Sequence, residues 1–473
     1  MTENLKRRTK IICTVGPSSN SWKTIRAMQL AGMDAVRINM SHATHDEAAE
    51  TVHWVDKLNQ ELRHHIPILL DTNGPEIRTG PLAKPLSLQP EESVLVSSDK
   101  QKSANSDIPF VYVGYKKFNT TLRTGDRIRL DNGLINLSVV KKTNEGLLCN
   151  VEDGGILGSR KHVNLPGVYV DLPTISARDK EAIKFAKAHN ISFIAQSFVR
   201  AALDIQVMRD LLGESHQWVK VVAKIENQDG VREAEAIAMA ADGIMVARGD
   251  LGIETDISAL PRLQRNLVRT SLGNGRRCMI ATHLLESMIE NPIPTRAEAI
   301  DVGNAVYEGV DALVLSSETS IGQRPAETVD QLRQIIVESE QTPGLNFAQS
   351  LVSRSVKQSI ARSAVELAER IEAIGVIVIT RTGLMADLVT NCAPIQVPIF
   401  AFSNLPTTTK RLMVNRGVYA RTTLFDTDPE KTIQTALQVL ADEENLNHRD
   451  KFVIVSDVLT EAAVESIQIR EVN

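Results

Sequence analysis

The chain has 473 residues, of which 42% are hydrophobic and 23% are charged, and it carries a formal net charge of −5. These values are typical of a globular protein with about three domains of roughly 150 residues each, and the negative charge argues against general nucleic-acid binding. No apolar run approaches the roughly 18 residues of a membrane span, and the N-terminus has no apolar signal segment, so we expect a cytoplasmic protein without membrane partners. The four cysteines form no CxxC pair, which indicates neither a disulfide framework nor a zinc site.

Short apolar runs with strand character alternate with helical patterns along most of the chain. The first three runs are KIICTVGP at 10–17, AVRINM at 35–40 and IPILLDT at 66–72. From about 74 to 167 the pattern changes to short strands separated by Gly, Asn and Asp turns, which predicts an inserted all-β domain. The first pattern then resumes in five further runs, at 191–198, 220–226, 243–250, 277–282 and 311–318.

Three strands before the insert and five after it make eight, which is the strand count of a (β/α)8 TIM barrel. Near-continuous apolar strands fit a parallel sheet that is covered by helices. After a linker near 342–346, a helical segment and further strand-like runs predict a separate α/β domain. The predicted organisation is an α/β chain with a barrel at 1–73 and 168–341, an inserted β-barrel at 74–167 and a C-terminal α/β domain at 345–473.

In a barrel of this kind the chemistry lies at the carboxyl ends of the strands, so the polar residues that end the apolar runs are the candidate site. Lys224 and Glu226 are two residues apart and point the same way from one strand end, and Asp250 ends the next run. Two carboxylates and an ammonium group suit a divalent metal and an anionic, phosphate-bearing substrate. The other strand ends contribute Arg37, Asn39, Ser41, Asp71, Thr72, Gly249, Thr282, Ser316 and Glu318.

Eight long motifs occur in the order in which one enzyme family carries them. The chain resembles pyruvate kinase, from residue 9 to about 330, in TKIICTVGP, VRINMSH, LDTNGPEIRTG, GSRKHVNLPG, AKIENQDG, IMVARGDLG, ATHLLESM and PTRAEAIDVGNAV. The resemblance implies transfer of a phosphoryl group from phosphoenolpyruvate to ADP, which gives pyruvate and ATP as the final step of glycolysis. It also implies a catalytic barrel, a β domain that closes over the site as a lid, a C-terminal regulatory domain and a homotetramer.

The resemblance further implies a role for each residue at the strand ends. Glu226 and Asp250 would hold Mg²⁺, or Mn²⁺, and Lys224 would stabilise charge on the transferring phosphoryl group. Arg37 would clamp the phosphate, and Thr282 would lie near the methylene carbon of the enolpyruvate, on the path that protonates it. The substrate-binding residues would be Arg37, Lys224, Gly249, Asp250 and Thr282.

A potassium site and a nucleotide site also follow from the resemblance. The oxygen donors of the K⁺ site would be Asn39, Ser41, Asp71 and Thr72. Glu76 supports a K⁺-dependent type, because family members that dispense with K⁺ resemble one another in carrying a lysine there. The residues that match nucleotide-contacting positions are Asn39, Ser41, His42, Arg78 and Lys161.

Other interpretations stand beside these. A metal-dependent lyase or aldolase of the pyruvate and phosphoenolpyruvate barrel group also uses Glu and Asp near an enolate, although it needs neither the β insert nor a K⁺ site. A weakly active regulatory paralogue is the third alternative, but Lys224, Glu226, Asp250 and Thr282 are all intact. At single positions, Asn39 and Ser41 could instead cap the following helix, and Lys161 could lie in a plain exposed turn.

Several positions depart from the residues that are commonest in the family, and the C-terminal domain departs most. Thr380, Thr382 and Gly383 remain in the loop TRTGLMAD, but SDVLTEAAVESIQIREVN has no late glycine loop. Without several N–H and O–H donors a doubly phosphorylated ligand is poorly held, so we expect weak or no activation by fructose bisphosphate. The departures in the barrel and the insert are Asn73, His162, His283 and Ser317.

Overall fold

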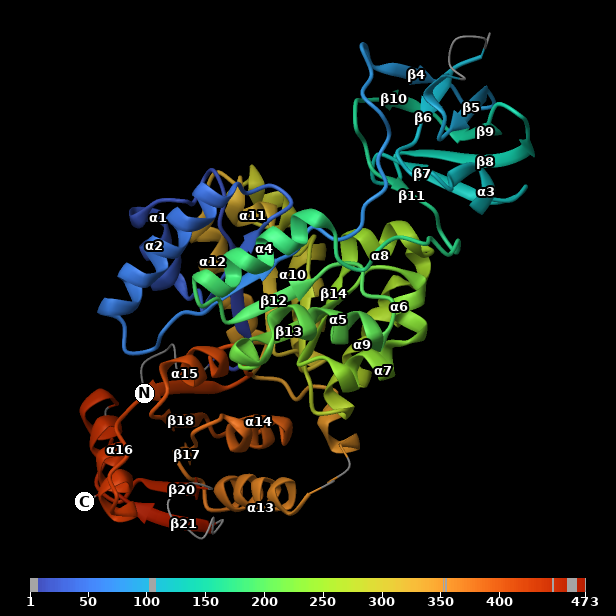
Figure 1. Ribbon diagram of the computed structural model, residues 1–473. Helices are drawn as coiled ribbons and strands as arrows, with labels where there is room; N and C mark the ends of the chain where they lie inside the picture. The colour runs from blue at the N-terminus through green and yellow to red at the C-terminus, as the bar shows by residue number, and fades with distance from the viewer. Residues whose placement is uncertain are drawn as a thin grey trace.

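The structure is a computed structural model that describes residues 7–101, 108–351, 353, 355–444, 446–456 and 466–472. Eight of its strands are β1 Lys10–Thr14, β2 Ala35–Asn39, β3 Ile68–Asp71, β12 Phe193–Gln196, β13 Lys220–Ile225, β14 Gly243–Ala247, β15 Arg277–Ala281 and β16 Ala312–Leu315. They are the eight predicted runs, and they pair in parallel as a closed barrel in the order β1-β16-β15-β14-β13-β12-β3-β2. The predicted (β/α)8 barrel is therefore confirmed (Figure 1).

Helices cover the outside of the barrel, so each barrel strand is buried on both of its faces. Alternate side chains such as Ile12, Leu69 and Met245 fill the interior, while Ile11 and Cys278 pack outward against the helices. Cys278 is fully buried in this layer, as expected for a core residue. The helices are α1 Trp22–Ala31, α2 His45–Glu61, α4 Ala177–Ala188, α5 Ala202–Leu212, α6 Gln228–Arg232, α7 Ala234–Ala240, α8 Arg248–Glu254, α9 Leu260–Gly273, α10 Arg296–Tyr307, α11 Ser317–Ser320 and α12 Pro325–Ser339.

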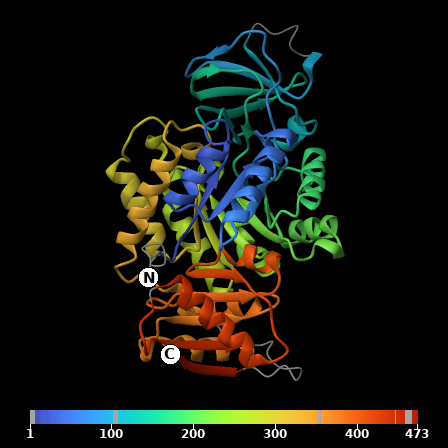
Figure 2. The same cartoon turned by 90° about the vertical axis from the view of Figure 1, so that its left-hand side faces the viewer.

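The segment between β3 and α4 forms an all-β unit with its own core, which includes Val94, Leu137 and Val151. Its elements are β4 Leu86–Leu88, β5 Ser93–Ser97, β6 Phe110–Tyr112, α3 Phe118–Thr121, β7 Arg127–Leu130, β8 Ile135–Lys142, β9 Leu147–Asp153, β10 Gly155–Leu157 and β11 Val163–Asn164. The strands hydrogen-bond as a six-stranded sheet, β11-β7-β8-β9-β5-β6, and a two-stranded sheet, β10-β4. The insert stands on the side of the barrel to which the carboxyl ends of the strands point (Figure 2).

The C-terminal part is an α/β unit built on a five-stranded sheet of order β19-β18-β17-β20-β21, in which only the β20–β21 pair is antiparallel. Its elements are α13 Val356–Arg370, β17 Gly375–Ile379, α14 Leu384–Asn391, β18 Ile399–Ser403, α15 Pro406–Leu412, β19 Val418–Thr422, α16 Pro429–Glu443, β20 Lys451–Ser456 and β21 Ser466–Glu471. It packs on the amino ends of the barrel strands, where Lys10 Nζ donates a 2.6 Å hydrogen bond to the Val418 carbonyl oxygen. No helix of the described residues is long and apolar enough to cross a membrane.

Candidate active site

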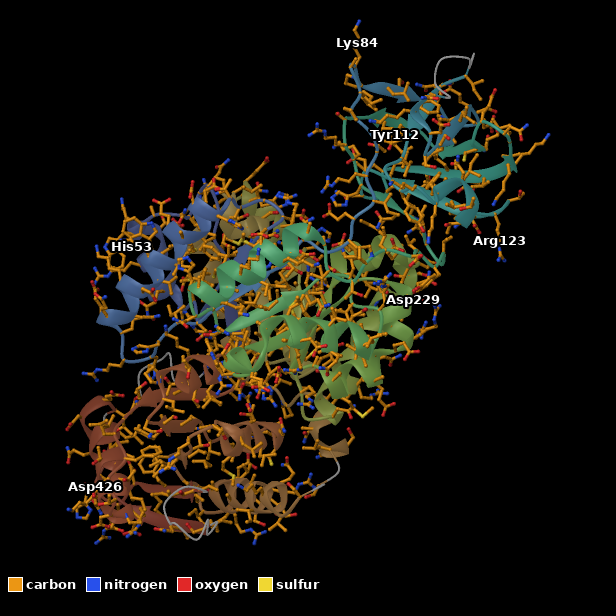
Figure 3. The ribbon with its side chains drawn as sticks, viewed as in Figure 1. His53, Lys84, Tyr112, Arg123, Asp229 and Asp426 are labelled. Carbon is orange, nitrogen blue, oxygen red and sulfur yellow. The ribbon has the colours of Figure 1, made fainter. Side chains whose placement is uncertain are left out.

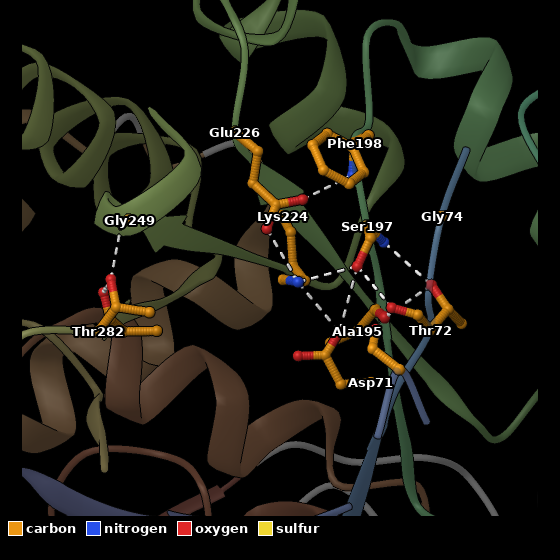
Figure 4. A network of polar contacts seen from close by, with 12 residues as sticks. Asp71, Thr72, Gly74, Ala195, Ser197, Phe198, Lys224, Glu226, Gly249 and Thr282 are labelled. Carbon is orange, nitrogen blue, oxygen red and sulfur yellow. Dashed lines mark hydrogen bonds and ion pairs between the residues drawn. The ribbon is translucent and has the colours of Figure 1, made fainter. Parts of the chain in front are cut away.

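Lys224, near the end of β13, lies at the centre of a buried charge cluster (Figure 4). Its Nζ is 3.1 Å from Asp71 Oδ1 and 2.9 Å from Glu226 Oε1, and it donates a 2.8 Å hydrogen bond to Ser197 Oγ. Arg37, on β2, reaches the other oxygen of Asp71, with Nη2 at 2.6 Å and Nε at 2.7 Å. Side chains from four different strand ends therefore meet at one point of the barrel rim.

The charges of the cluster do not balance evenly. Burial disfavours the ionised form of Asp71, but Lys224 and Arg37 outweigh it and lower the pKa of this carboxyl. Burial also acts against the charge of Lys224, yet Asp71 and Glu226 raise its pKa, so the ammonium group stays protonated. For Glu226 burial prevails over Lys224 and raises the pKa to about 7, and burial raises the pKa of Asp250 as well. Lys224 therefore does not fully compensate the charges of the second pair of carboxyls, Glu226 and Asp250.

Glu226 has an oxygen that is ready for a further ligand. Its Oε2 accepts a 2.7 Å hydrogen bond from the Phe198 N–H, whereas the buried Oε1 has the 2.9 Å ion pair with Lys224 Nζ and no further partner among the described residues. Within the described ranges no group of three His, Cys, Asp or Glu side chains could hold a metal by itself. The Glu226–Asp250 pair therefore fits a Mg²⁺ site better than a closed structural metal site. Mg²⁺ takes one or two carboxylates and completes its shell with water and substrate oxygens.

The sixth predicted run is shorter than expected. β14 ends at Ala247, and Gly249 and Asp250 lie in the first turn of α8 rather than on the strand. The helix dipole favours an aspartate in the first turn of a helix, which explains why β14 ends before Asp250. The Gly249 N–H, a candidate donor to a substrate carboxylate, here donates a 2.8 Å hydrogen bond to Thr282 Oγ1 (Figure 4).

Thr282 stands in an unusual turn. Its φ is +73° and that of His283 is +52°, and such values are rare for a β-branched residue. Arg248, which is 7% exposed, donates from Nη2 to the carbonyl oxygens of both residues, at 2.7 and 2.9 Å. Its Nη1 forms an ion pair of 2.6 Å with Asp301 on α10. Arg248 thus fixes the turn that presents the Thr282 hydroxyl, and the sequence analysis did not single it out.

Asn39 and Asp71 face each other across the β2–β3 pair, and Asn39 Oδ1 accepts a 3.1 Å hydrogen bond from the Ser41 N–H. Neither Asn39 nor Ser41 caps the helix that follows. The N-cap residue of α2 is Thr44, whose side chain forms a capping box with Glu47. The alternative in which Asn39 and Ser41 merely cap α2 is therefore wrong.

Ser197, just after β12, ties the oxygen donors to the charge cluster. Its Oγ accepts from Lys224 Nζ, and it lies 2.7 Å from the Thr72 carbonyl oxygen and 3.2 Å from Asp71 Oδ1. Its N–H donates a 3.0 Å hydrogen bond to Thr72 Oγ1. The sequence analysis took no residue from the fourth strand, although the same strand-end pattern leads to Ser197.

Of the residues expected on the nucleotide side, Arg78 lies at the base of the insert, where it contacts Glu76 and His162. Arg78 Nε is 2.7 Å from Glu76 Oε2, and Arg78 Nη2 is 2.6 Å from His162 Nε2. Burial lowers the pKa of His162; Glu76 raises it, and the charges of Arg78 and of His42, which is on the barrel, lower it. The side chain of His42 is exposed.

Lys161 does not point to the Arg78 group. Its Nζ forms an ion pair of 3.0 Å with Asp131 within the insert. The insert and the barrel meet around a narrow cavity of about 100 Å³, which Asn164 and Glu254 line and also bridge with a 2.7 Å hydrogen bond. Asp229, labelled in Figure 3, lines the same cavity from α6. That 2.7 Å hydrogen bond and those that Arg129 donates to the carbonyl oxygens of Ile253 and Thr255 join the insert to the end of α8 at the rim.

Glu318, a candidate from the eighth strand end, supports the rim, whereas Arg296, which was not among the candidates, forms no hydrogen bond or ion pair there among the described residues. The buried Glu318 accepts hydrogen bonds from the N–H groups of Ser316 and Leu285, at 2.7 and 3.2 Å, and so orders two loops at the rim. Arg296 is exposed at the start of α10. Of the departures, the Asn73 N–H is held by Asp179 at 2.8 Å, and Ser317 starts α11.

Comparison with known proteins agrees with this geometry. The family model "Pyruvate kinase, barrel domain" matches residues 6–329, and "Pyruvate kinase, alpha/beta domain" matches residues 358–468. "Pyruvate kinase" of Dictyostelium discoideum is 36% identical over 96% of this chain and 91% of its own length. The "Pyruvate kinase" of Geobacillus stearothermophilus is 35% identical over 96% and 78%, and "Plastidial pyruvate kinase 2" of Arabidopsis thaliana is 34% identical over 99% and 82%. The chain therefore belongs to the pyruvate kinase family, the phosphotransferases that convert phosphoenolpyruvate and ADP to pyruvate and ATP.

Proposed function

We propose that the charge cluster around Lys224 is the place where phosphoenolpyruvate gives up its phosphoryl group to ADP. The observation that carries this proposal is Lys224 itself, whose Nζ lies within 3.1 Å of both Asp71 and Glu226 at the carboxyl end of the barrel. A buried ammonium group there stabilises the charge that develops on the phosphoryl oxygens during transfer. Arg37, held in place by Asp71, adds a planar donor group that suits a phosphate.

Glu226 and Asp250 would hold Mg²⁺, or Mn²⁺, and the bound metal supplies positive charge to the enolate and phosphoryl oxygens. The Glu226 Oε1 atom, which has no described partner besides Lys224, and the raised pKa of both carboxyls support this, since buried acids gain from a cation. The Gly249 N–H, which here donates to Thr282 Oγ1, would turn to the substrate carboxylate. Thr282 would pass a proton to the enolate carbon from this fixed hydroxyl.

Asn39, Ser41, Asp71 and Thr72 would hold K⁺. The carboxylate of Asp71 is already paired with two cations, and the amide of Asn39 opposite it is neutral, so this set suits a monovalent better than a divalent ion. Glu76 adds a negative charge in the loop that follows Asp71 and Thr72, in agreement with an enzyme of the K⁺-dependent type.

The whole proposal is tested by a coupled assay for pyruvate formation from phosphoenolpyruvate and ADP, with Mg²⁺ present throughout. We expect turnover that requires ADP, and we expect most of it to be lost when K⁺ is replaced by tetramethylammonium at constant ionic strength. Pyruvate release without ADP would contradict phosphoryl transfer, and equal rates in the two monovalent ions would remove the K⁺ site from the proposal.

Replacing Arg248 by methionine should loosen the turn that carries Thr282. The substitution leaves the carbonyl oxygens of the turn and the Asp301 carboxylate without their donor, so we expect the free energy of unfolding to fall by about 3 kcal/mol. The kcat should fall more than the KM for phosphoenolpyruvate changes, because the Thr282 hydroxyl is displaced. Urea unfolding and steady-state kinetics check both effects. Arg26→Met, at a half-exposed arginine of α1, is the matched control and should change neither.

Fructose 1,6-bisphosphate should not shift the phosphoenolpyruvate saturation curve. In the loop after β17, Thr380 is buried and its Oγ1 accepts from the Gly383 N–H at 3.1 Å, while Thr382 Oγ1 accepts from the Leu384 N–H at 3.4 Å. These two N–H groups are used within the loop and the Thr380 hydroxyl is buried, which leaves few donors for two phosphates. Residues 457–465, in the stretch for which we expect no late glycine loop, lie outside the described residues. A clear leftward shift on adding the sugar would contradict this prediction.

The other parts of the proposal concern the assembly. The insert at 74–167 would close as a lid and bring Lys161 from Asp131 to the nucleotide, together with His42 and Arg78. The C-terminal unit at 345–473 would regulate the barrel at 1–73 and 168–341, within a homotetramer. We place the protein in the cytoplasm, while one relative at 34% identity is named as plastidial. Size-exclusion chromatography with light scattering tests the tetramer.

A further inference from the structure

The helix α8 carries Gly249 and Asp250 in its first turn, and it lies on the side of the barrel that faces the insert (Figure 1). It spans only Arg248–Glu254, and a helix of this length is not stable in water through its own hydrogen bonds. The carbonyl oxygens of its last turn have no donor within the helix and need one from elsewhere. The position of Asp250 therefore depends on what holds the two ends of α8.

The amino end of α8 is fixed by the barrel. The Gly249 N–H donates to Thr282 Oγ1 at 2.8 Å, and Arg248 Nη2 donates to the Thr282 carbonyl oxygen at 2.7 Å. These contacts tie the first turn of the helix to the turn after β15. They determine where α8 starts, and the contacts at the other end determine its direction.

The carboxyl end of α8 is held from the insert and from the barrel. Arg129, on β7, donates from Nη1 to the carbonyl oxygens of Ile253 and Thr255, the latter at 3.1 Å. The barrel supplies a further donor, because Gln228 Nε2 donates a 2.8 Å hydrogen bond to the Glu254 carbonyl oxygen. A cation at this end of a helix also meets the negative pole of the helix dipole. The insert thus supplies the donor for two of these three carbonyl oxygens.

The insert touches the same end of α8 at two further points. A Cβ at Gly133, in the turn between β7 and β8, would lie 3.8 Å from Ile253 Cγ2, and Asn164 Nδ2 donates to Glu254 Oε1 at 2.7 Å. Ile253 and Glu254 are only half-buried, and the insert and α8 line a cavity of about 240 Å³ here. Packing alone therefore does not fix this end of the helix, and the guanidinium group of Arg129 supplies the charged contact.

Arg127, two residues earlier on β7, has the same charge but a different partner. Side chains two residues apart point to the same side of a strand, so both arginines face the same way, and both line the cavity beside α8. The Arg127 side chain is 63% exposed, and its Nε lies 3.9 Å from Glu152 Oε2 within the insert. Of the two arginines, only Arg129 is hydrogen-bonded to the end of α8 in the described structure.

We propose that Arg129 is a positioning residue for the metal site, because it joins the insert to the end of α8 and so fixes the place of Asp250. This inference rests on the proposed function in one respect, namely that Asp250 is a metal ligand. Since Arg129 belongs to the insert, a displacement of the insert reaches the metal site through α8. The metal affinity of the chain thus depends on a residue that does not itself bind the metal.

The test is a titration of the full chain with Mn²⁺ in the absence of substrates, with the free ion measured by electron paramagnetic resonance. Arg129→Met keeps an apolar stem but removes the guanidinium group. We expect it to bind Mn²⁺ about threefold to tenfold more weakly, an effect below that of losing a group that orients a metal ligand directly. Arg129→Lys should restore part of the affinity, because an ammonium group can still reach one of the two carbonyl oxygens. Arg127→Met is the matched control and should bind Mn²⁺ as the wild type does.

The kinetic counterpart is the Mn²⁺ requirement of pyruvate formation. The Mn²⁺ concentration that gives half of the maximal rate should rise in Arg129→Met by the same factor as the dissociation constant. The kcat at saturating Mn²⁺ should stay close to that of the wild type, because the substitution removes no group that the proposed reaction uses. A fall in kcat with an unchanged Mn²⁺ requirement would contradict the proposal.

The melting temperature separates positioning from a purely structural role. A folded Arg129→Met variant that melts earlier but binds Mn²⁺ as the wild type does would overturn the inference and leave the proposed metal site intact. An equal loss of affinity in Arg127→Met would overturn it too, since the net charge of the insert would then be the cause. A wild-type chain that binds no Mn²⁺ would instead remove the metal site itself from the proposed function. Arg129→Gln, whose side chain is too short to reach both carbonyl oxygens, repeats the measurement if Arg129→Met does not fold.

Discussion

Replacing Lys224 by methionine is expected to lower kcat by about 10²–10³-fold, which corresponds to a loss of about 3–4 kcal/mol of transition-state stabilisation. Methionine keeps the length and apolar stem of lysine but removes the one ammonium group that joins Asp71, Glu226 and Ser197. The KM for phosphoenolpyruvate should change less, because Arg37 remains paired with Asp71 and would still bind the phosphate. Steady-state kinetics on the purified variant measure both values.

A folding control accompanies this experiment, since the substitution leaves Glu226 without its nearest cation. Circular dichroism and the melting temperature show whether the variant is folded. Lys184→Met is the matched control, because Lys184 is a 72% exposed lysine on α4 that pairs only with its neighbour Glu181. A folded Lys224→Met variant with the kcat of the wild type would refute the proposed site.

Replacing Glu226 by glutamine should weaken the binding of Mn²⁺ by at least tenfold to a hundredfold. Loss of groups that merely orient metal ligands already has an effect of that size, and Glu226 would be a ligand itself. Glutamine preserves the shape of the side chain and can still accept from the Phe198 N–H, so the change is mainly one of charge. Electron paramagnetic resonance of free Mn²⁺ gives the affinity without any turnover, and kcat should fall in parallel.

Glu235→Gln, at an exposed glutamate of α7, is the control for this charge change and should bind Mn²⁺ as the wild type does. An unchanged Mn²⁺ affinity in Glu226→Gln, together with a reduced kcat, would assign Glu226 to holding Lys224 instead of the metal. Lys224→Met and Glu226→Gln thus test separately the role of the ammonium group and the role of the metal ligand in the same cluster.

Much of the candidate site followed from two regularities of the sequence. Side chains two residues apart point to the same side of a strand, and the carboxyl ends of parallel barrel strands meet at one rim. These rules placed Lys224 and Glu226 together, and they added Arg37 and Asp71 from other strands. The same rules missed the fact that Asp250 belongs to a helix, because a strand end and a helix start carry the same apolar-to-acidic transition.

The sequence by itself determined the barrel, the insert, the C-terminal unit and the charged residues of the rim, because periodic apolar runs and strand ends are local features of the chain. The tertiary structure alone decided which partners those residues have. Ser197 bridges Lys224 and Thr72, and Arg248 holds the turn of Thr282. Each of these depends on segments that are distant in sequence and come together only in the packed chain, and no local pattern records such a contact.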